Sequence, residues 1–299
     1  MRIPQRLLAN AGRDQGWDDW LARLPAMITD LLDDWRLTPD GEPMAGATAY
    51  VLPVRDQDRR PAALKIGVPH WEAEFEHLAL RAWDGNGVVR LYRADPHRRA
   101  MLLESADQSR DLNGPEVVTA CEIIAGLYPR LHRPAIPQLR KLSEVTAEVA
   151  DQLAGLHDHP AVPRRLADQA RSLAHSFAED PDTDGRLIHT DLHYDNVLAA
   201  DREPWLVIDP KPLSGDPAFE VAPLLWNRWE EAVATDDLRN AILDRLFTVV
   251  DTAGLDEDRV RNWVIVRELT NVMYAVEGGS APDDDWITMS IVIAKAMVP

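Results

Sequence analysis

The order of β-type and helical patterns along the chain restricts its fold most strongly. Short β-type runs at 47–55 and 62–67 are joined by a polar turn and predict an antiparallel hairpin. A helix expected at 71–83 ends at a glycine-rich breaker, and two more strands are expected at 88–93 and 100–104. Before this sheet, an amphipathic stretch at 17–35 predicts a helix that is broken or kinked near Pro25.

Beyond about residue 105 the patterns are mainly helical. Helices are expected near 115–132, 143–157, 163–179, 218–232, 236–253, 257–277 and 285–297. One short β segment interrupts them, made of 187–189, 197–200 and 205–208. These patterns predict an α+β fold of two lobes with a cleft between them. The N-terminal lobe, a small antiparallel sheet, is expected at 1–104, and the mainly helical C-terminal lobe at 105–299.

Charge limits the kinds of partner. The 299 residues carry a formal net charge of −18, which argues against nucleic acid because neutralising phosphates requires excess Lys and Arg. A cationic small molecule is favoured instead. Residues 210–299 contain 16 acidic and 8 basic residues, so this segment could line a site for a basic substrate. Solvated helix faces would account for the same charges equally well.

Apolar runs and cysteine content indicate the compartment. No run approaches the roughly 18–20 apolar residues of a membrane span, and the first residues lack the apolar centre of a signal peptide. We therefore expect a cytoplasmic protein without a membrane partner. The single cysteine, Cys121, cannot form an internal disulfide and is expected in the core.

The segment from His189 to Asn196 carries the strongest chemical signal. A hairpin turning at 201–204 would bring Asn196 close to Asp209, and carboxylate and amide oxygens suit Mg²⁺. Asp191 precedes Asn196 by five residues and could orient and deprotonate an incoming hydroxyl. The spacing predicts a magnesium site next to a catalytic base.

This arrangement resembles the catalytic loop of protein kinases, in which the same spacing separates the Asp and the Asn. Thr190 stands where those enzymes have Arg, and Asp209-Pro210-Lys211 stands in place of Asp-Phe-Gly. The motif is similar to that of the aminoglycoside phosphotransferase branch of the kinase-like fold.

The same residues also allow two alternative roles. The alternation of His189, Asp191 and His193 could indicate a transition-metal site, but no histidine follows to complete it. Asp191 and Asp209 could instead cap turns. His189 belongs to the predicted catalytic group, where a hydrogen-bonding role beneath the loop is favoured over proton transfer. His193 has no assigned role.

Lys65 is the candidate phosphate-binding cation. It lies within an apolar strand, in a chain with four lysines and 28 arginines, although an edge-strand lysine reaching water is the alternative. In the kinase families that the loop resembles, this strand lysine contacts the α- and β-phosphates of ATP and pairs with a helix glutamate. Glu76 is chosen as that partner, while Glu72 and Glu74 stay open.

Other nucleotide contacts are expected from backbone. The loop before the first strand could cover phosphates, with Gly46 allowing close approach and Thr48 adding a hydroxyl. The segment 101–105, which includes Glu104, is the expected hinge whose backbone would pair with adenine. A P-loop motif is absent from the sequence.

Three stretches carry a resemblance to one family, the aminoglycoside/hydroxyurea antibiotic resistance kinases. They are WDGNGVVRL at 83–91, the loop at 189–196, and WLVIDPKPLSGDPAFEVAPLLWNR at 205–228. The resemblance spans about 46–229. It implies ATP, Mg²⁺ and transfer of the γ-phosphoryl group to a hydroxyl of a streptomycin-like aminoglycoside or of hydroxyurea, which gives antibiotic resistance.

Residues that follow the metal-binding Asp are expected near the acceptor. Glu220, Trp226 and Asn227 are the candidates, although a core position is the commoner role for a residue such as Trp226. A kinase acting on another small metabolite and a non-catalytic nucleotide-binding regulator are the alternative functions. A protein kinase is disfavoured because no Ala-Pro-Glu element follows Asp209.

Overall fold

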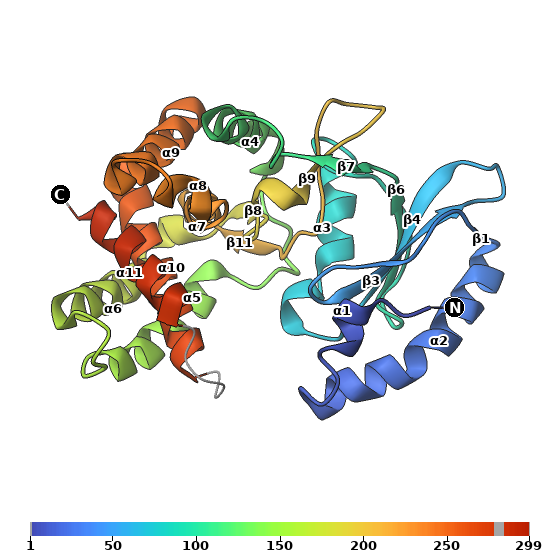
Figure 1. The fold of residues 1–299 in the computed structure, drawn as a ribbon, viewed down its shortest axis with the longest axis horizontal. Helices are drawn as coiled ribbons and strands as arrows, with labels where there is room; N and C mark the ends of the chain where they lie inside the picture. The colour runs from blue at the N-terminus through green and yellow to red at the C-terminus, as the bar shows by residue number, and fades with distance from the viewer. Residues whose placement is uncertain (1, 278–283, 299) are drawn as a thin grey trace. The chain divides into compact units, whose positions relative to one another are not determined.

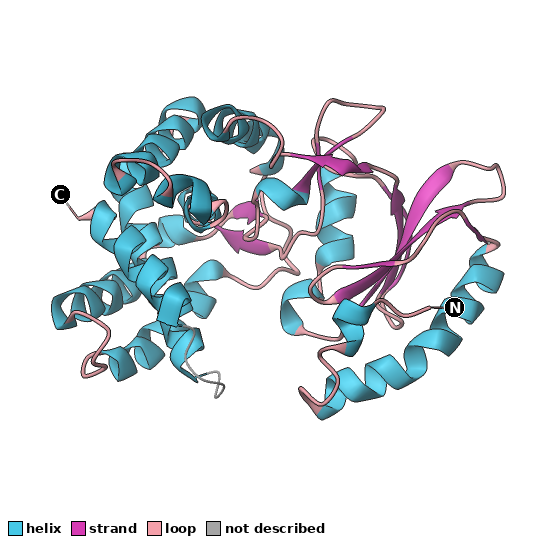
Figure 2. Ribbon diagram, viewed as in Figure 1, coloured by secondary structure: helices cyan, strands magenta, loops and turns pink. Residues whose placement is uncertain are grey.

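A computed structural model of the protein describes residues 2–277 and 284–298 and divides into two compact units (Figures 1 and 2). The first comprises Met1–Ser109 and Leu198–Lys211, and the second comprises Arg110–Val197 and Pro212–Pro299. The first unit contains the large sheet and the second is mainly helical, as expected for an α+β chain. Residues 198–211, expected in the C-terminal lobe, belong to the first compact unit. The domain boundary after residue 104 stays a prediction.

A six-stranded antiparallel sheet forms the centre of the first unit. Its strands follow the order β1-β3-β4-β6-β5, and β2 pairs with β3. The strand bounds are β1 (Thr38–Pro39), β2 (Met44–Ala45), β3 (Ala49–Arg55), β4 (Pro61–Gly67), β5 (Leu91–Asp95) and β6 (Ala100–Glu104). The helices of this unit are α1 (Gln5–Leu8), α2 (Gln15–Trp35) and α3 (Glu76–Trp83), with a 3₁₀ turn η1 at Trp71–Ala73.

The predicted hairpin is confirmed as β3 and β4, paired from Ala49 opposite Gly67 to Arg55 opposite Pro61. Its turn is closed by the Asp56 carboxylate, which accepts hydrogen bonds from the N–H groups of Asp58 and Arg60. Short polar side chains that bond to nearby backbone favour such turns over continued strand. The polar run between the two apolar segments therefore determined the hairpin.

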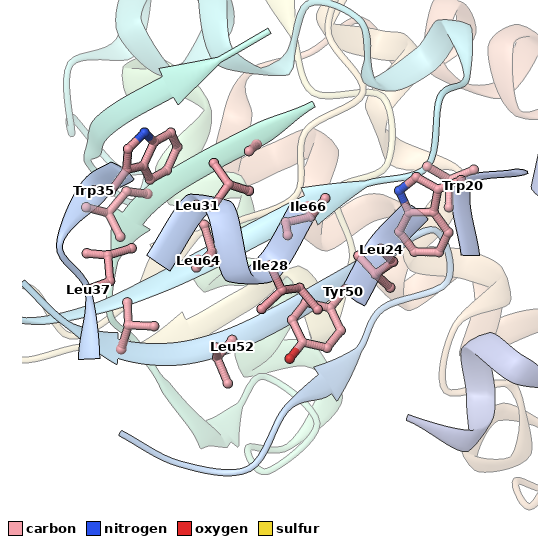
Figure 3. Packing of buried hydrophobic residues seen from close by; sticks show 14 of the residues in the cluster. Trp20, Leu24, Ile28, Leu31, Trp35, Leu37, Tyr50, Leu52, Leu64 and Ile66 are labelled. Carbon is pink, nitrogen blue, oxygen red and sulfur yellow. The ribbon is translucent and has the colours of Figure 1, made fainter. Parts of the chain in front are cut away.

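Helix α2 covers one face of this sheet, and α3 lies on the other side of it (Figure 1). Buried side chains of α2, including Leu24, Ile28 and Leu31, pack with Leu64 and Ile66 of β4 (Figure 3). Because successive strand residues point to opposite faces, Lys65 points away from α2 and toward α3. The helix continues through Pro25, so the break expected there does not occur.

Two elements of the first unit differ from their prediction. The helix expected at 71–83 begins only at Glu76, after the 3₁₀ turn. The strand expected at 88–93 begins at Leu91. Val88 instead forms an isolated bridge with Val207, in which the Val89 N–H donates to Val207 O and the Val207 N–H donates to Gly87 O. Strands β1 and β2 have two residues each, too few to produce a visible alternation.

Helices make up most of the second unit (Figure 2). They are α4 (Val117–Leu131), α5 (Leu142–Gln152), α6 (Arg164–Glu179), α7 (Pro223–Trp226), α8 (Trp229–Val233), α9 (Leu238–Ala253), α10 (Glu257–Glu277) and α11 (Asp284–Met297). The 3₁₀ turns are η2 (Leu153–Leu156), η3 (Pro181–Thr183), η4 (Tyr194–Asn196) and η5 (Pro217–Val221). The long helices agree with their predicted ranges within about three residues, apart from the 3₁₀ end at η2.

The prediction of one continuous helix at 218–232 is wrong. This stretch is divided into η5, α7 and α8, and Asn227 and Arg228 separate the last two. Asn227 is extended, and Arg228 has a φ of 54°, which ends one helix and begins the next in a new direction.

The prediction of one β segment in the second half is also wrong, because its strands belong to two separate sheets. Strand β8 (Arg186–Ile188) pairs with β11 (Leu213–Gly215). A second sheet has the order β10-β9-β7, with β7 at Asp107–Asp111, β9 at Val197–Ala199 and β10 at Leu206–Val207. Strands β7 and β11 were missed because the first is wholly polar and the second has three residues.

Helix α10 buries a carboxyl group, Glu268, which has no exposed surface. Burial raises its pKa to about 8, and the side chains of Ser290 and Asn271 offset only part of this effect. Between about pH 4.5 and pH 8 the folded protein therefore binds one proton more than the unfolded chain, so stability falls as the pH rises through this range.

We expect Glu268→Gln to be more stable than wild type by about 2–4 kcal/mol at pH 8 and by much less at pH 5, since Gln resembles the protonated acid. Urea unfolding of both proteins at the two pH values measures this difference. An equal difference at pH 5 and pH 8 would contradict a titrating Glu268.

Among the residues that the structure describes, none of the helices has the length and apolar character of a membrane span.

Candidate active site

Lys65 has two carboxylate partners in the first unit. Its Nζ lies 2.5 Å from Glu76 Oε1 and also bonds to Asp209 Oδ1. Of the three glutamates left open by the sequence, Glu76 at the start of α3 is therefore the ion-pair partner. The side chains of Lys65 and Glu76 are almost fully buried, whereas one third of the Asp209 side chain is exposed. The lysine does not reach outward to water, so the edge-strand alternative is excluded.

A second lysine holds the other oxygen of Asp209. Lys211 Nζ lies 2.8 Å from Asp209 Oδ2 and 3.3 Å from the Asp209 carbonyl oxygen. Burial alone would raise the pKa of Asp209, but Lys65 and Lys211 outweigh it and hold that pKa well below its usual range. Burial would also lower the pKa of Lys65, and its two carboxylates reverse that effect and raise it. Asp209 and Lys65 therefore both stay charged at neutral pH.

The backbone at Asp209 is in a rarely occupied conformation. Its φ is 55°, in the left-handed region that non-glycine residues seldom adopt. Short side chains such as Asp and Asn tolerate this region better than others. The conformation belongs to an irregular segment after β10.

Gly46 and Thr48 lie in the tight turn between β2 and β3. The N–H of Gly46 donates to Ala49 O, and Thr48 O accepts from the N–H of Val68. A Cβ on Gly46 would meet only Ala49 O at 3.9 Å, so a side chain would fit but would reduce the open space at the turn. Contact of these two residues with phosphates stays a prediction.

The side chain of Glu104 is bonded within the first unit. Both of its carboxylate oxygens accept from the Arg202 guanidinium, at 2.9 and 2.8 Å, and its N–H donates to Arg90 O. Arg202 also donates to the carbonyl oxygens of Gly85 and Val88. The Glu104 side chain therefore ties residues 198–211 to the sheet, and the pairing of the 101–105 backbone with adenine stays a prediction. The sequence did not predict the contact with Arg202, because Arg202 lies in the expected hairpin turn, 98 residues from Glu104.

Backbone contacts hold Asp191 in the second unit while its carboxylate is 40% exposed. Its N–H donates to His189 Nδ1 at 3.3 Å, and its carbonyl oxygen accepts from Asn196 Nδ2 at 2.8 Å. The predicted pair Asp191 and Asn196 thus lies in one hydrogen-bonded loop. His189 is fully buried beneath this loop, which favours the structural role over proton transfer.

Glu220 supports the loop from below and does not face an acceptor. It is fully buried, and its Oε1 accepts from the N–H groups of His189 and Thr190, while Oε2 lies 2.8 Å from His132 Nε2. Burial would raise its pKa, but the bond from His132 and the backbone donors outweigh that and lower it. The expected acceptor contact of Glu220 is therefore wrong, since both of its oxygens are bonded within the protein.

These bonds hold a strained residue. Thr190 has a φ of 65°, an outlier for a β-branched side chain. Its N–H is bound by Glu220, and its carbonyl oxygen accepts from Arg267 Nη2 at 2.9 Å. Strained backbone persists where surrounding contacts hold it, and here it lies next to the candidate base Asp191.

Arg267 is a further residue of the site, and no local pattern in the sequence marks it. Arg259, Trp263 and Arg267 follow one another at intervals of four residues on one face of α10. The first two donate hydrogen bonds to the Asp216 carboxylate. The Arg267 guanidinium also lies 5.1 Å from the Trp226 ring centroid. Burial lowers the pKa of Arg267 to about 10, so it stays a cation at neutral pH. It therefore connects the catalytic loop to Trp226.

His193 lies beside the loop, with Nε2 3.1 Å from Asn196 Nδ2 and 3.7 Å from Asp191 Oδ1. Within residues 2–277 and 284–298, no three His, Cys, Asp or Glu side chains gather closely enough to hold a metal ion. The donors therefore do not form the cluster that the transition-metal alternative requires.

Trp226 and Asn227 line a pocket of about 780 Å³ in the second unit. Trp229 and Trp286 add two more indole rings, and Trp286 meets Trp226 at a centroid distance of 6.4 Å in an edge-on arrangement. Two acidic residues, Glu230 and Asp285, also line the pocket. Trp226 is half-buried at this wall, so it is not a core residue.

Comparison with known sequences shows the family of the chain. A model of the aminoglycoside/hydroxyurea antibiotic resistance kinase family matches residues 34–279. The chain belongs to this family. It is accordingly a phosphotransferase, which confirms the resemblance and the enzyme class that the sequence motifs implied.

Relatives of established name cover nearly all of the chain. A streptomycin 6-kinase of Streptomyces glaucescens is 40% identical over 99% of this chain and 97% of its own length. A hydroxyurea phosphotransferase of Kitasatospora aureofaciens is 38% identical over 93% of this chain and 81% of its own length.

Solved structures confirm the two-lobed kinase-like fold. An aminoglycoside phosphotransferase in complex with ADP and hygromycin B has a TM-score of 0.62 at 15% identity, covering 91% of this chain and 98% of that one. A choline/ethanolamine kinase family protein from Mesorhizobium loti has a TM-score of 0.60 at 16% identity, covering 95% of each chain.

Proposed function

We propose that this phosphotransferase moves the γ-phosphoryl group of ATP, with Mg²⁺, to a hydroxyl group of a streptomycin-like aminoglycoside. The pocket lined by Trp226, Glu230 and Asp285 carries this choice of acceptor. The names of the two streptomycin 6-kinase relatives, 40% and 38% identical, point the same way. Hydroxyurea is the competing acceptor, because one relative of similar identity carries that name.

Lys65 would bind the phosphates of the nucleotide. It is a buried cation fixed by Glu76, so the ammonium group is held in position before the nucleotide arrives. Preorganised charge of this kind stabilises phosphoryl transfer without reorganisation during the reaction.

Asp209 and Asn196 would hold the Mg²⁺. The Asp209 carboxylate is charged and one third exposed, which suits a hard cation. The amide nitrogen of Asn196 is engaged with Asp191 O and His193, which leaves its amide oxygen as the possible ligand. These donors therefore fit the ion. When bound, Mg²⁺ would neutralise charge on the transferring group.

Asp191 would orient the acceptor hydroxyl and take its proton. Its carboxylate is partly exposed, while its N–H and carbonyl groups are fixed by His189 and Asn196. A base whose backbone is fixed and whose carboxylate is accessible can bond to a substrate hydroxyl in one orientation.

The acceptor would lie in the pocket beside Trp226. A volume of about 780 Å³ is within the range of small-molecule sites. Guanidinium and ammonium groups are attracted to indole faces and to carboxylates, and this wall offers both. The Arg267 side chain contacts both Trp226 and the carbonyl oxygen of Thr190. It therefore connects the pocket wall to the residue next to Asp191. Hydroxyurea is small and neutral and would use little of this surface.

Transfer of radiolabelled γ-phosphate tests this proposal on a panel of streptomycin, other aminoglycosides, hydroxyurea, choline and a generic protein. We expect Mg²⁺-dependent transfer to streptomycin and none to the protein. Transfer to hydroxyurea alone would contradict the proposed acceptor, and absence of transfer to every compound would contradict the proposed function.

The two acidic residues at the pocket allow a more specific prediction about acceptor binding. Replacing Glu230 and Asp285 together by Gln and Asn should raise the KM for streptomycin about tenfold or more, with kcat little changed, since two charge-assisted contacts are lost. The matched control is Asp251→Asn, which removes an exposed carboxylate from α9. Equal KM values in the wild type, the double variant and the control would remove the pocket from the acceptor site.

A further inference from the structure

Two of the four lysines in the chain converge on one carboxylate. Lys65 bonds to Oδ1 of Asp209 and Lys211 to Oδ2, so each oxygen carries an ammonium partner. The Lys211 side chain is 12% exposed, which makes it nearly as enclosed as Lys65. Both contacts lie within the first compact unit.

Direct metal coordination by Asp209 is favoured when one of these two lysines moves away from the carboxylate. A metal ion needs an oxygen lone pair of the carboxylate, and two cations at the same oxygen repel each other. Lys65 is the less able to move, because it lies within β4 and is also held by the buried Glu76 carboxylate. Lys211 is in the irregular segment between β10 and β11, and a lysine stem is flexible. Lys211 is therefore the lysine that leaves.

We propose that Lys211 is a second phosphate-binding residue, whose ammonium group moves from Asp209 to the terminal phosphate when ATP and Mg²⁺ bind. This inference rests on the proposed function. Lys65 and Lys211 approach different oxygens of Asp209, so their ammonium groups hold separate positions beside this carboxylate. Because the resemblance puts Lys65 at the α- and β-phosphates, the γ-phosphate is left to Lys211.

The consequence for catalysis follows from charge. Negative charge on the oxygens of the transferring group must be stabilised, and a cation held beside them does this without a change of protonation. The ammonium group exchanges one anionic partner, the Asp209 carboxylate, for another, the phosphate. No covalent bond to Lys211 forms or breaks.

Isothermal titration calorimetry of the full chain tests this role, with ADP and with a non-hydrolysable ATP analogue at saturating Mg²⁺. For Lys211→Met we expect the Kd of the analogue to rise about tenfold and the Kd of ADP to stay within twofold, because ADP lacks the terminal phosphate. Phosphoryl transfer should fall about 10²-fold. Lys141→Met is the matched control, since Lys141 is exposed at the start of α5.

The Mg²⁺ dependence of ADP binding checks that Lys211 pairs with Asp209, whereas analogue affinity and transfer separate phosphate binding from the role of a simple counter-ion. Lys211→Met removes the ammonium partner of Asp209 Oδ2. Whether Lys211 binds phosphate or only neutralises Asp209, a Mg²⁺ titration of ADP binding should therefore reach its midpoint at a lower Mg²⁺ concentration in the variant. A lower midpoint with unchanged analogue affinity and unchanged transfer would show that Lys211 only neutralises Asp209, and would overturn the proposal. An equal loss of ADP and analogue affinity would also overturn it.

Further outcomes separate this inference from the proposed function. If the wild type binds the analogue and phosphorylates streptomycin while both Lys211→Met and Lys211→Gln match it, the inference fails and the proposed function stands. If the wild type binds neither nucleotide, both fail. Thermal melting of each variant within a few degrees of wild type verifies that affinity is measured on folded protein.

Discussion

Asp209→Asn is expected to lower Mg²⁺-dependent phosphoryl transfer about 10³-fold or more. A bound metal ion stabilises the charge of the transition state in such reactions by several kcal/mol. Each 1.4 kcal/mol corresponds to a factor of about ten in rate. An amide in place of the carboxylate keeps one oxygen but loses the charge that attracts the ion and pairs with Lys65 and Lys211. The measurement is the initial rate of transfer to streptomycin as Mg²⁺ is varied.

The fold should survive this change. Asn tolerates the left-handed conformation that residue 209 adopts, and the side chain is one third exposed. The circular dichroism spectrum of the variant should match that of wild type. A rate and a Mg²⁺ requirement like those of wild type would remove Asp209 from the metal site.

Asp191→Asn is expected to lower kcat by about 10²–10⁴-fold with nearly unchanged affinity for ATP. The substitution keeps size and hydrogen bonding but removes the charge and the basicity. In a loose transition state the acceptor proton leaves late, so orientation of the hydroxyl accounts for part of the effect. Turnover and nucleotide affinity are measured on the same preparation.

The outcome distinguishes two positions for Asp191. Since the proposed nucleotide contacts are Lys65, Asn196 and Asp209, lost ATP binding would place Asp191 on the nucleotide side. Unchanged turnover would exclude it as the base. Thr190→Ser is a useful control, because it alters the strained residue next to Asp191 without altering the carboxylate.

Helix α10 gives the catalytic loop a support that local sequence does not reveal. Thr190 replaces the arginine that the kinase loop has before its aspartate, and a partly buried cation from α10, Arg267, instead bonds to the Thr190 carbonyl oxygen. Glu220 binds the N–H of the same residue. Thr190 is thus held at both of its backbone groups by side chains that are 30 and 77 residues away.

Local patterns identified most of the secondary structure and the motif residues. The hairpin of β3 and β4, the long helices and the loop with Asp191 and Asn196 follow from periodicity, turn residues and fixed spacing. The interrupted helix at 218–232 was not foreseen, because Asn227 and Arg228 change direction without a Gly or Pro between them.

One role changed once distant contacts were known. Glu220 was expected at the acceptor from its closeness to Asp209 in sequence, yet its carboxylate is buried under His189. The distance along the chain was known from the sequence, but the direction of the side chain was not. The contact between the Glu104 carboxylate and Arg202 was likewise not foreseen.

Sequence alone was enough to recognise the family, the two-lobed α+β fold and the chemically active residue types, because a catalytic loop keeps its geometry only at short, fixed spacings. Only the tertiary structure identified Glu76 as the partner of Lys65 and brought Lys211 to Asp209 and Arg267 to Thr190. The physical reason is that a buried charge must find its partner wherever the fold brings one. That partner can lie two residues away, as Asp209 does from Lys211, or 77 residues away, as Thr190 does from Arg267, and no periodic pattern marks either contact.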